Sequence, residues 1–281
     1  MQTVAIVGVG LIGASFGLAL RGAGFTGRIL GVSSERSIRA AVGRHAIDDG
    51  VPLETAVSEA DLIYLSQTIG GILDTLPKLA GRLKPGALVT DAGSTKRRIA
   101  EAAASLGPAF IGGHPMAGKV SRGAAGAESS LFEGRPYILT PATPEQMDDP
   151  RVRSLAYWIQ RIGARLVVLS PAGHDRLVAA ASHLPQLLST ALAAHLEQSA
   201  DPDATASVAG PGLLDMTRLA LSSHEIWRDI LSTNPDEIAA AIQGIENQLA
   251  ALRESLGHPS TESIFAAGRS FALRLRPGQS D

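Results

Sequence analysis

The sequence predicts an α/β fold, in which a Rossmann-like, doubly wound and mostly parallel sheet is followed by an all-α C-terminal domain. The first observation is an alternation of short apolar runs with helix-length segments through the first 170 residues. The second is that several runs are apolar at successive positions, as expected of strands covered on both faces. The third is that strand signals stop after Ser170-Pro171. We therefore expect one domain over 1–170 and a helical domain over 171–281.

The expected elements follow in chain order. Strands are predicted for seven short apolar runs, at residues 4–7, 29–32, 62–65, 87–90, 110–112, 137–139 and 166–169. Crossover helices are predicted between them, for example at 34–44, 70–83 and 96–106. Helices are expected in the second domain at 172–200, 212–221, 223–231 and 235–256, and residues 276–281 are expected to fray.

Composition limits the classes of function. The chain has 281 residues, 45% of them hydrophobic and 19% charged, with a net charge of −2 and no cysteine. These values are typical of a globular enzyme and exclude a disulfide or a thiolate metal site. No block of basic residues indicates nucleic acid or a membrane surface as a partner. We expect a small-molecule substrate, no metal site and a cytoplasmic location.

One predicted helix is apolar on nearly every face, over residues 177–196. In a soluble protein such a helix must be enclosed on all sides. A second copy of the chain would supply the cover, so we expect a homodimer through the helical domain; burial within a single chain is the alternative. Pro185 is expected to kink a helix or to start one, because its ring removes an internal hydrogen bond.

A dinucleotide-binding loop is predicted between the first strand and the first helix. The segment Gly8-Val9-Gly10-Leu11-Ile12-Gly13 follows an apolar strand, which is the context that gives a GxGxxG motif its meaning. Gly8 allows the tight turn, Gly10 lets a pyrophosphate approach the backbone, and Gly13 allows close packing of helix on strand. The N–H groups of the helix N-terminus, from Leu11 and Ile12 onward, would then face the phosphates.

The end of the second strand bears on the choice between NAD and NADP. Proteins that prefer NAD place a carboxylate there to bind the ribose 2′-hydroxyl, but this chain has Ser33 at that position. Ser33, Ser34 and Arg36 could instead bind a 2′-phosphate, so NADP is the expected cofactor. NAD stays possible because the carboxylate of Glu35, just after Ser34, could still reach the ribose, and Arg36 could be an ordinary solvated helix residue.

Two loops at predicted carboxyl ends of strands carry chemically useful side chains. The first contains Ser94, within Asp91-Ala92-Gly93-Ser94-Thr95-Lys96, and the second contains His114, within Gly112-Gly113-His114-Pro115. A histidine in this place can take a proton from an alcohol while hydride leaves the same carbon. The alternatives are a packing role for His114 and a helix-capping role for Ser94.

Further motifs follow the glycine loop with Ser15 and the two loops around Ser94 and His114, and they run in order to the second domain. These motifs are HPMAG at 114–118, residues 132–141, His174-Asp175, SHLP at 182–185, TRLA at 217–220 and Trp227. With these motifs the chain resembles the prephenate and arogenate dehydrogenases of tyrosine biosynthesis.

The resemblance implies oxidative decarboxylation of a cyclohexadienol. A nicotinamide takes hydride from the carbinol carbon, His114 takes the hydroxyl proton, and Ser94 positions the hydroxyl and the histidine. Resemblance assigns the substrate carboxylates to Arg218 and His183. As alternatives, Arg218 could pair with Asp215 on its own helix and His183 could be a core histidine. His174 and Asp175 are expected to be structural, at the start of a helix.

The substrate is expected to be arogenate, with prephenate, or both, as the close rival. Prephenate-using relatives often carry Thr-Glu after HPMAG, where this chain has Lys119-Val120. Two other classes remain open as alternatives. A non-catalytic nucleotide sensor would not require Ser94, His114 and Arg218 together. A hydroxyacid or imine-reducing dehydrogenase would explain the glycine loop but not HPMAG with SHLP.

Overall fold

The computed structural model describes residues 1–119, 121 and 123–276. An eight-stranded sheet has the order β3-β2-β1-β4-β5-β6-β7-β8, and all neighbouring strands run parallel except β6 and β7. Its strands are β1 (Thr3–Val7), β2 (Arg28–Val32), β3 (Asp49–Gly50), β4 (Leu62–Leu65), β5 (Leu88–Asp91), β6 (Phe110–Pro115), β7 (Pro136–Thr140) and β8 (Arg165–Val168). The mostly parallel sheet is confirmed, and the seven predicted strands are present; the two-residue β3 was not predicted.

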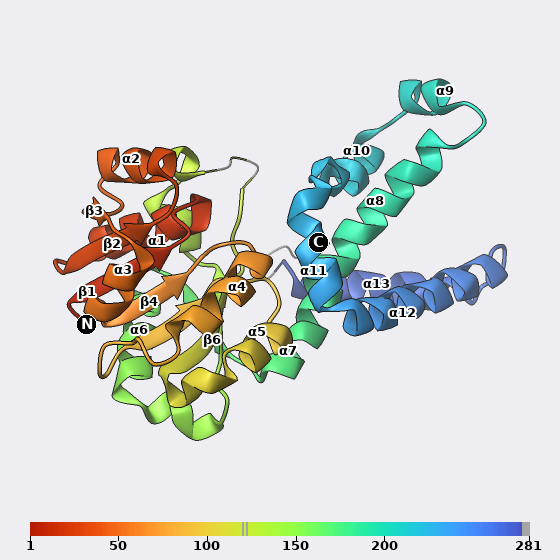
Figure 1. Cartoon of the computed structure of the whole chain (residues 1–281). Helices are drawn as coiled ribbons and strands as arrows, with labels where there is room; N and C mark the ends of the chain where they lie inside the picture. The colour runs from red at the N-terminus through yellow and green to blue at the C-terminus, as the bar shows by residue number, and fades with distance from the viewer. Residues whose placement is uncertain (120, 122, 277–281) are drawn as a thin grey trace.

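Helices cover both faces of the sheet, which confirms the doubly wound arrangement (Figure 1). The helices of this region are α1 (Leu11–Gly22), α2 (Glu35–Gly43), α3 (Leu53–Glu59), α4 (Ile69–Leu79), α5 (Arg97–Ala102) and α6 (Pro150–Arg161). Successive residues of β1 face opposite sides: Val4 and Ile6 pack with α1 and α6, whereas Ala5 and Val7 pack with α3 and α4. Burial on both faces explains why these strands are apolar throughout.

The order of strands reverses between β1 and β4, which are neighbours in the sheet. The loops that leave β1 and β4 therefore diverge to opposite sides and leave a crevice at their carboxyl ends. Open α/β sheets bind their ligands in such a crevice. The glycine loop leaves β1 at this point, and residues 66–68 leave β4 beside it.

The described chain after β8 is helical and contains no strand. Its helices are α7 (Pro171–Val178), α8 (Leu184–Glu197), α9 (Pro202–Ser207), α10 (Pro211–Thr217), α11 (His224–Thr233), α12 (Pro235–Glu254) and α13 (Thr261–Arg274). Figure 1 shows α8 and the α12–α13 hairpin extending away from the sheet. The helices α9 and α13 were not predicted. Residues 277–281 of the expected frayed tail lie outside the described residues.

The expected helix at 172–200 is one continuous run of helix from Pro171 to Glu197 with an irregular turn inside it. Ala179–His183 forms a π-helical turn, and α8 then begins at Leu184 with Pro185 in its first turn, as predicted for that proline. The wider π turn accommodates a residue that cannot donate a backbone hydrogen bond. His183 is the last residue of this turn, so its position depends on the proline after it.

The described residues alone do not enclose this apolar helix. Only 28% of the residues in its most apolar 18-residue stretch are buried, so burial within a single chain does not account for most of this stretch. By length and composition the helix could also cross a membrane, but core helices of soluble proteins pass the same test. We therefore expect the surface of a second protein molecule to cover the exposed part of this helix.

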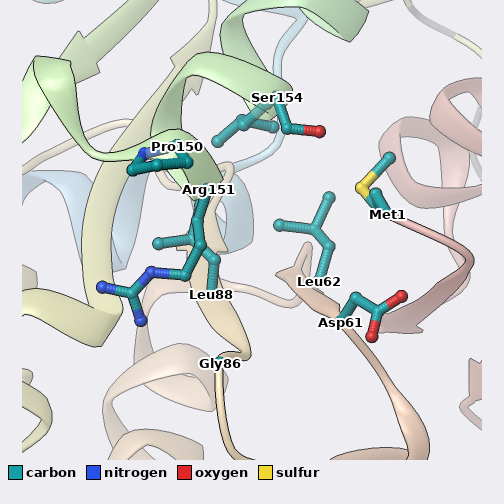
Figure 2. Close-up of a pocket in the computed structure, with 9 residues that line it drawn as sticks. Met1, Asp61, Leu62, Gly86, Leu88, Pro150, Arg151 and Ser154 are labelled. Atoms are coloured by element: carbon teal, nitrogen blue, oxygen red, sulfur yellow. The ribbon is translucent and has the colours of Figure 1, made fainter.

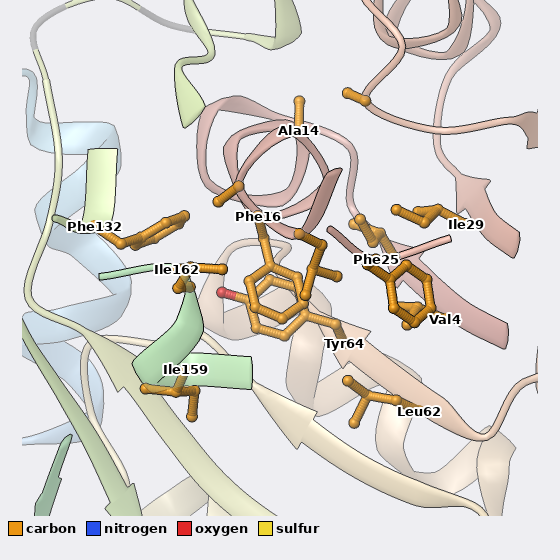
Figure 3. Packing of buried hydrophobic residues seen from close by; sticks show 14 of the residues in the cluster. Val4, Ala14, Phe16, Phe25, Ile29, Leu62, Tyr64, Phe132, Ile159 and Ile162 are labelled. Atoms are coloured by element: carbon orange, nitrogen blue, oxygen red, sulfur yellow. The ribbon is translucent and has the colours of Figure 1, made fainter. Parts of the chain in front are cut away.

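A stacked pair of aromatic rings lies at the centre of the sheet's core (Figure 3). Phe16 of α1 and Tyr64 of β4 have ring centroids 4.1 Å apart and planes 21° apart, and both side chains are fully buried. The contact holds α1 against the strand whose loop lines the crevice. The energy of this ring contact therefore contributes to the stability of the glycine loop at the start of α1.

Replacing Phe16 with Ala should lower the free energy of unfolding by about 3–5 kcal/mol, because it leaves a cavity under α1. The measurement is urea unfolding followed by circular dichroism. Tyr157→Ala is the matched control, because Tyr157 is 54% exposed, and it should change stability by less than about 1 kcal/mol. Equal losses in the two variants would contradict the central role of the stack.

Candidate functional site

The glycine loop has the geometry of a phosphate cradle. Gly8 has a φ of +95°, a conformation that side chains disfavour, and a Cβ there would lie 2.6 Å from the backbone nitrogen of Gln67. A Cβ on Gly13 would lie 2.5 Å from the carbonyl oxygen of Gly8. At Gly10, by contrast, a Cβ would meet nothing within 4 Å. The packing of the protein thus requires glycine at positions 8 and 13, whereas the space beside Gly10 is left open for a ligand.

The start of α1 fits the phosphates of a dinucleotide. The N-cap residue of α1 is Gly10, which offers no side chain to bind the first backbone N–H groups. Those groups, from Leu11 and Ile12 onward, are the donors that an anion at a helix N-terminus uses. The N–H groups and the space above Gly10 together fit the pyrophosphate of a nicotinamide dinucleotide.

The predicted 2′-phosphate residues lie together where β2 ends. Ser33 and Arg36 are exposed, and among the described residues neither side chain has a hydrogen-bond or ion-pair partner. Ser34 caps α2 by accepting a hydrogen bond from the backbone N–H of Ser37. Glu35 forms an ion pair with Arg39 one helical turn later. Glu35, the carboxylate that kept NAD possible, is therefore paired with Arg39 of its own helix. Arg36 remains available to bind a 2′-phosphate.

A cleft of about 190 Å³ lies between the crevice and α11. Ser94 lines it, opposite Ile12 of the glycine loop and Asp229 of α11. Asp229 accepts a hydrogen bond of 2.9 Å from the backbone N–H of Gly70, which joins α11 to the start of α4. The cleft therefore lies between the sheet domain and the helices, at the place where a nicotinamide ring would extend from the glycine loop.

Ser94 does not cap the following helix, so that alternative is wrong. The helix α5 begins at Arg97 with Lys96 as its N-cap residue and no side-chain cap on its own segment. Its first N–H groups are bound instead by Asp175 of α7, whose two carboxylate oxygens accept from the backbone N–H of Lys96 at 2.7 Å and of Arg97 at 2.9 Å. Ser94 is left partly exposed in the cleft.

His114 is the first of three linked side chains at the end of β6. Its Nδ1 lies 2.8 Å from Nε2 of His174, whose Nδ1 lies 2.8 Å from a carboxylate oxygen of Asp175. His174 and Asp175 are fully buried, whereas 8% of His114 is exposed. Of these three linked side chains, only that of His114 is thus accessible to a substrate.

A buried ion pair lies beside these residues. Lys96 and Asp91 are both fully buried, and the Lys96 ammonium contacts the Asp91 carboxylate. Asp91 also accepts hydrogen bonds from the backbone N–H of Gly93 at 2.8 Å and of Gly113 at 3.1 Å. Removing one partner from such a pair is strongly destabilising, because the other charge is left buried alone. The pair connects the Ser94 loop to the residue before His114.

Burial and neighbouring charge both act on the histidines. Burial lowers the pKa of His114 well below 6.5, and the charges of His174, Lys96 and His183 lower it further. Burial likewise lowers the pKa of His174, although Asp175 opposes this change. At neutral pH His114 is therefore uncharged and able to accept a proton.

The helical domain contributes two further buried polar groups, one of which, His183, acts electrostatically on His114. The rings of His183 and Trp227 meet edge to face with centroids 5.9 Å apart, and His183 Nδ1 and Trp227 Nε1 are buried without a hydrogen-bond partner among the described residues. Burial lowers the pKa of His183 to about 4. Such unpaired groups are rare in proteins and are typical of a site that binds a polar ligand. The alternative of a satisfied core histidine is therefore not supported for His183.

Arg218 lies on the turn that packs against α8. The next two residues bind that helix: Gln186 donates to the Leu219 carbonyl at 2.8 Å, and the Ala220 N–H donates to Ser189 at 3.1 Å. The Arg218 side chain is exposed, and no ion pair with Asp215 is found among the described residues. The structural ion pair considered for Arg218 is thus absent from this part of the chain.

Sequence reasoning missed three members of this site. His174 and Asp175 were expected to be structural, and Lys96 was given no role, yet His174 contacts His114, Asp175 contacts His174, and the charge of Lys96 acts on His114. A signal that could have found two of them was a histidine next to a carboxylate shortly after the strand predicted at 166–169. Such pairs are common at helix starts, so only the link to His114 distinguishes this one.

Comparisons with known proteins agree with this geometry. The family model described as "Prephenate dehydrogenase, nucleotide-binding domain" matches residues 16–168, and that described as "Prephenate dehydrogenase, dimerization domain" matches residues 170–268. The chain belongs to the prephenate dehydrogenase family. The alternative of an unrelated hydroxyacid dehydrogenase is thereby excluded.

Members of the prephenate dehydrogenase family with different named substrates are similar to this chain. The prephenate dehydrogenase of Lactococcus lactis is 34% identical over 89% of this chain and 70% of its own length. A crystal structure of Aquifex aeolicus prephenate dehydrogenase with hydroxyphenyl propionate and NAD+ has a TM-score of 0.87 at 33% identity, covering 98% and 97% of the two chains. A Synechocystis arogenate dehydrogenase structure has a TM-score of 0.85 at 32% identity, covering 97% and 99%.

A methyl group at Gly10 should block the cofactor without disturbing the fold. Gly10→Ala should raise the dissociation constant of the nicotinamide nucleotide by about tenfold or more, because the added Cβ occupies the space left for pyrophosphate. Fluorescence titration measures the affinity. Gly43→Ala is the control, since a Cβ there also meets nothing within 4 Å but lies on α2. Unchanged affinity in Gly10→Ala would show that phosphate does not approach at this residue.

Proposed function

We propose that this chain oxidatively decarboxylates arogenate to tyrosine and transfers the hydride to NADP. The observation that supports this most directly is His114, a buried and uncharged histidine at the end of β6 that is linked to His174 and Asp175. Ser94 lines a cleft that also includes Ile12 of the glycine loop. We further propose a dinucleotide-binding domain over 1–170 and a substrate-binding, dimerising domain over 171–281. A cytoplasmic homodimer is part of the same proposal.

His114 acts twice on the same oxygen atom. The bound nicotinamide supplies the acceptor for the hydride of the carbinol carbon. His114 takes the hydroxyl proton as that carbon becomes a ketone, and Ser94 orients the hydroxyl. The product of this step is a vinylogous β-keto acid, so the electrons of the breaking carbon–carboxylate bond flow into the ring and onto the ketone oxygen. His114 then returns the proton to that oxygen, and carbon dioxide leaves.

This sequence balances without a net proton. The substrate loses hydride and carbon dioxide, and the phenol keeps the proton that the hydroxyl had. Formation of the aromatic ring makes the second step irreversible. Because the proton returns to its own oxygen, His114 needs no exchange with solvent during a turnover.

Arg218 and His183 are proposed to bind the substrate carboxylates. A guanidinium can bind a carboxylate with two parallel hydrogen bonds, and among the described residues no partner competes for Arg218. His183 and its neighbour Trp227 offer buried polar atoms without partners. These groups would hold the ring of the substrate between the helical domain and His114.

The preference for NADP is supported by the end of β2, where Arg36 is available and Glu35 is engaged with Arg39. Arogenate carries an ammonium group, and the carboxylate side chains of Glu225 and Asp229 line the cleft. Lys119 is paired with Glu128, and Val120 lies outside the described residues. Prephenate is the second candidate, because the Lactococcus and Aquifex relatives are named for that substrate.

The test of specificity pairs arogenate and prephenate with NAD and NADP, following absorbance of the reduced nicotinamide. We expect arogenate with NADP to give the highest kcat/KM. Ser33→Asp should shift the preference to NAD, because a carboxylate there binds the 2′-hydroxyl and repels a 2′-phosphate. Faster turnover of prephenate with NAD would leave the chemistry of His114 intact and refute the arogenate and NADP assignments.

The pH profile tests the role of His114. The reactive form is neutral, and it is lost as the pH falls through the pKa of His114, which lies well below 6.5. The value of kcat/KM should therefore be flat from pH 8 to 6.5 and fall only at lower pH. His114→Asn should lower kcat by about 10²-fold or more and remove this acid limb, while nucleotide affinity is kept. An acid limb at 6.5 or above in the native enzyme would contradict a buried, uncharged base.

A further inference from the structure

Asp175 is the fixed end of the chain of side chains that reaches His114. Its carboxylate accepts hydrogen bonds from two backbone N–H groups, those of Lys96 and Arg97, at 2.7 and 2.9 Å. Its own backbone carbonyl accepts a bond of 2.9 Å from the amide of Asn234. Burial acts to raise the pKa of Asp175, but the bonds from His174, Arg97 and Lys96 outweigh it and lower that pKa. Asp175 is therefore an ionised, acceptor-only group.

The state of Asp175 determines the state of His174. An ionised carboxylate 2.8 Å from His174 Nδ1 requires that this nitrogen carry a proton. Burial lowers the pKa of His174, so the ring carries one proton rather than two. The other nitrogen, Nε2, is then an acceptor with a free lone pair.

The lone pair on His174 Nε2 in turn sets the tautomer of His114. Its Nδ1 lies 2.8 Å from the acceptor nitrogen of His174, so it must donate, and the proton of the neutral ring is on Nδ1. That leaves Nε2 of His114 with a lone pair. A hydrogen-bond partner for this atom is not found among the described residues, and His114 is the least buried of the three linked side chains.

We propose that Asp175 and His174 are positioning residues that hold the proton of His114 on Nδ1, so that Nε2 is the atom that accepts the substrate hydroxyl proton. The proposal rests on the proposed function of His114 as a base. When His114 takes the proton, the positive charge it acquires faces the His174 lone pair and, through His174, the Asp175 carboxylate. The chain would thus orient the base and stabilise its charged form, as the third member of a hydrolase triad does.

The opposite arrangement would disable the base. If His174 donated from Nε2, His114 would accept on Nδ1 and carry its own proton on Nε2, toward the substrate. That arrangement requires a His174 that is doubly protonated or an Asp175 that is not ionised. The two backbone donors on Asp175 oppose the second condition, and the burial of His174 opposes the first.

The tautomer can be measured directly. Long-range 1H–15N correlation spectra of the full-length protein with 15N-labelled histidine distinguish Nδ1–H from Nε2–H rings, and His114→Asn and His174→Phe assign the two signals. We expect Nδ1–H for both rings in the free protein. An Nε2–H signal for His114 would overturn the proposal, and because no substrate is present, this result would leave the role of His114 in the reaction to be tested by activity.

Two variants test the consequence for catalysis. Asp175→Asn and His174→Phe should each move His114 toward the Nε2–H form and lower kcat by roughly 10²-fold, with KM little changed. The Phe variant keeps a ring of similar size against His114, whose ring centroid lies 5.1 Å from that of His174. Full activity with an altered tautomer, in a variant that is folded by circular dichroism, would refute the link between tautomer and rate.

Asp149→Asn is the matched control. Asp149 also accepts a backbone N–H at the start of a helix, that of Arg151 in α6, but it lies away from the histidines. It should lose stability as a helix cap without changing the His114 tautomer or kcat. Equal loss of kcat in Asp149→Asn and Asp175→Asn would show that the effect comes from helix capping alone and would overturn the positioning role. If His114→Asn lost activity but Asp175→Asn and His174→Phe did not, the positioning role would be overturned, while the proposed function of His114 would stand.

Discussion

The carboxylate of Asp175 is the contact on which the rest of the site depends. It belongs to α7, the first helix after the sheet, yet it binds the first backbone N–H groups of α5, which belongs to the sheet region. The same group contacts His174. One buried charge therefore joins the two parts of the chain and organises the polar residues around His114. Its burial is tolerated because each of its oxygen atoms accepts a hydrogen bond.

The neighbouring ion pair of Lys96 and Asp91 has a related role. Asp91 accepts hydrogen bonds from the backbone N–H groups of Gly93, in the loop after β5, and of Gly113, in β6, and Lys96 neutralises its charge. A Cβ on Gly113 would lie 2.5 Å from the Asp91 carbonyl oxygen, so β6 can approach β5 this closely only with glycine there. Small residues and a buried pair thus place His114 accurately at the strand end. A deep site can then keep a histidine uncharged at neutral pH.

Two cavities in the protein surface differ in how well they suit a catalytic site. A cavity of about 320 Å³ lies near the starts of β4 and β5, with Arg151 and Asp61 among its lining residues (Figure 2). Arg151 is held there by Asp149, and Asp61 by Lys84. The smaller cleft beside Ser94 lies at the opposite ends of the strands, where the loops after β1, β4 and β5 converge. The location at the switch point, rather than size, distinguishes the candidate site.

The sequence by itself determined the sheet, the glycine loop, and the candidate residues Ser94 and His114, whereas His183 and Arg218 came from the family resemblance. The first features are local, because apolar runs mark strands and a turn that needs glycine shows it in the chain. Only the tertiary structure decided that His174 contacts His114 and Asp175 contacts His174, that Asp175 rather than Ser94 caps α5, and that Glu35 is paired with Arg39. These contacts join residues up to 79 positions apart or depend on which way a side chain turns. Folding brings such groups together through the packing of the whole domain, and local propensity carries no record of that packing.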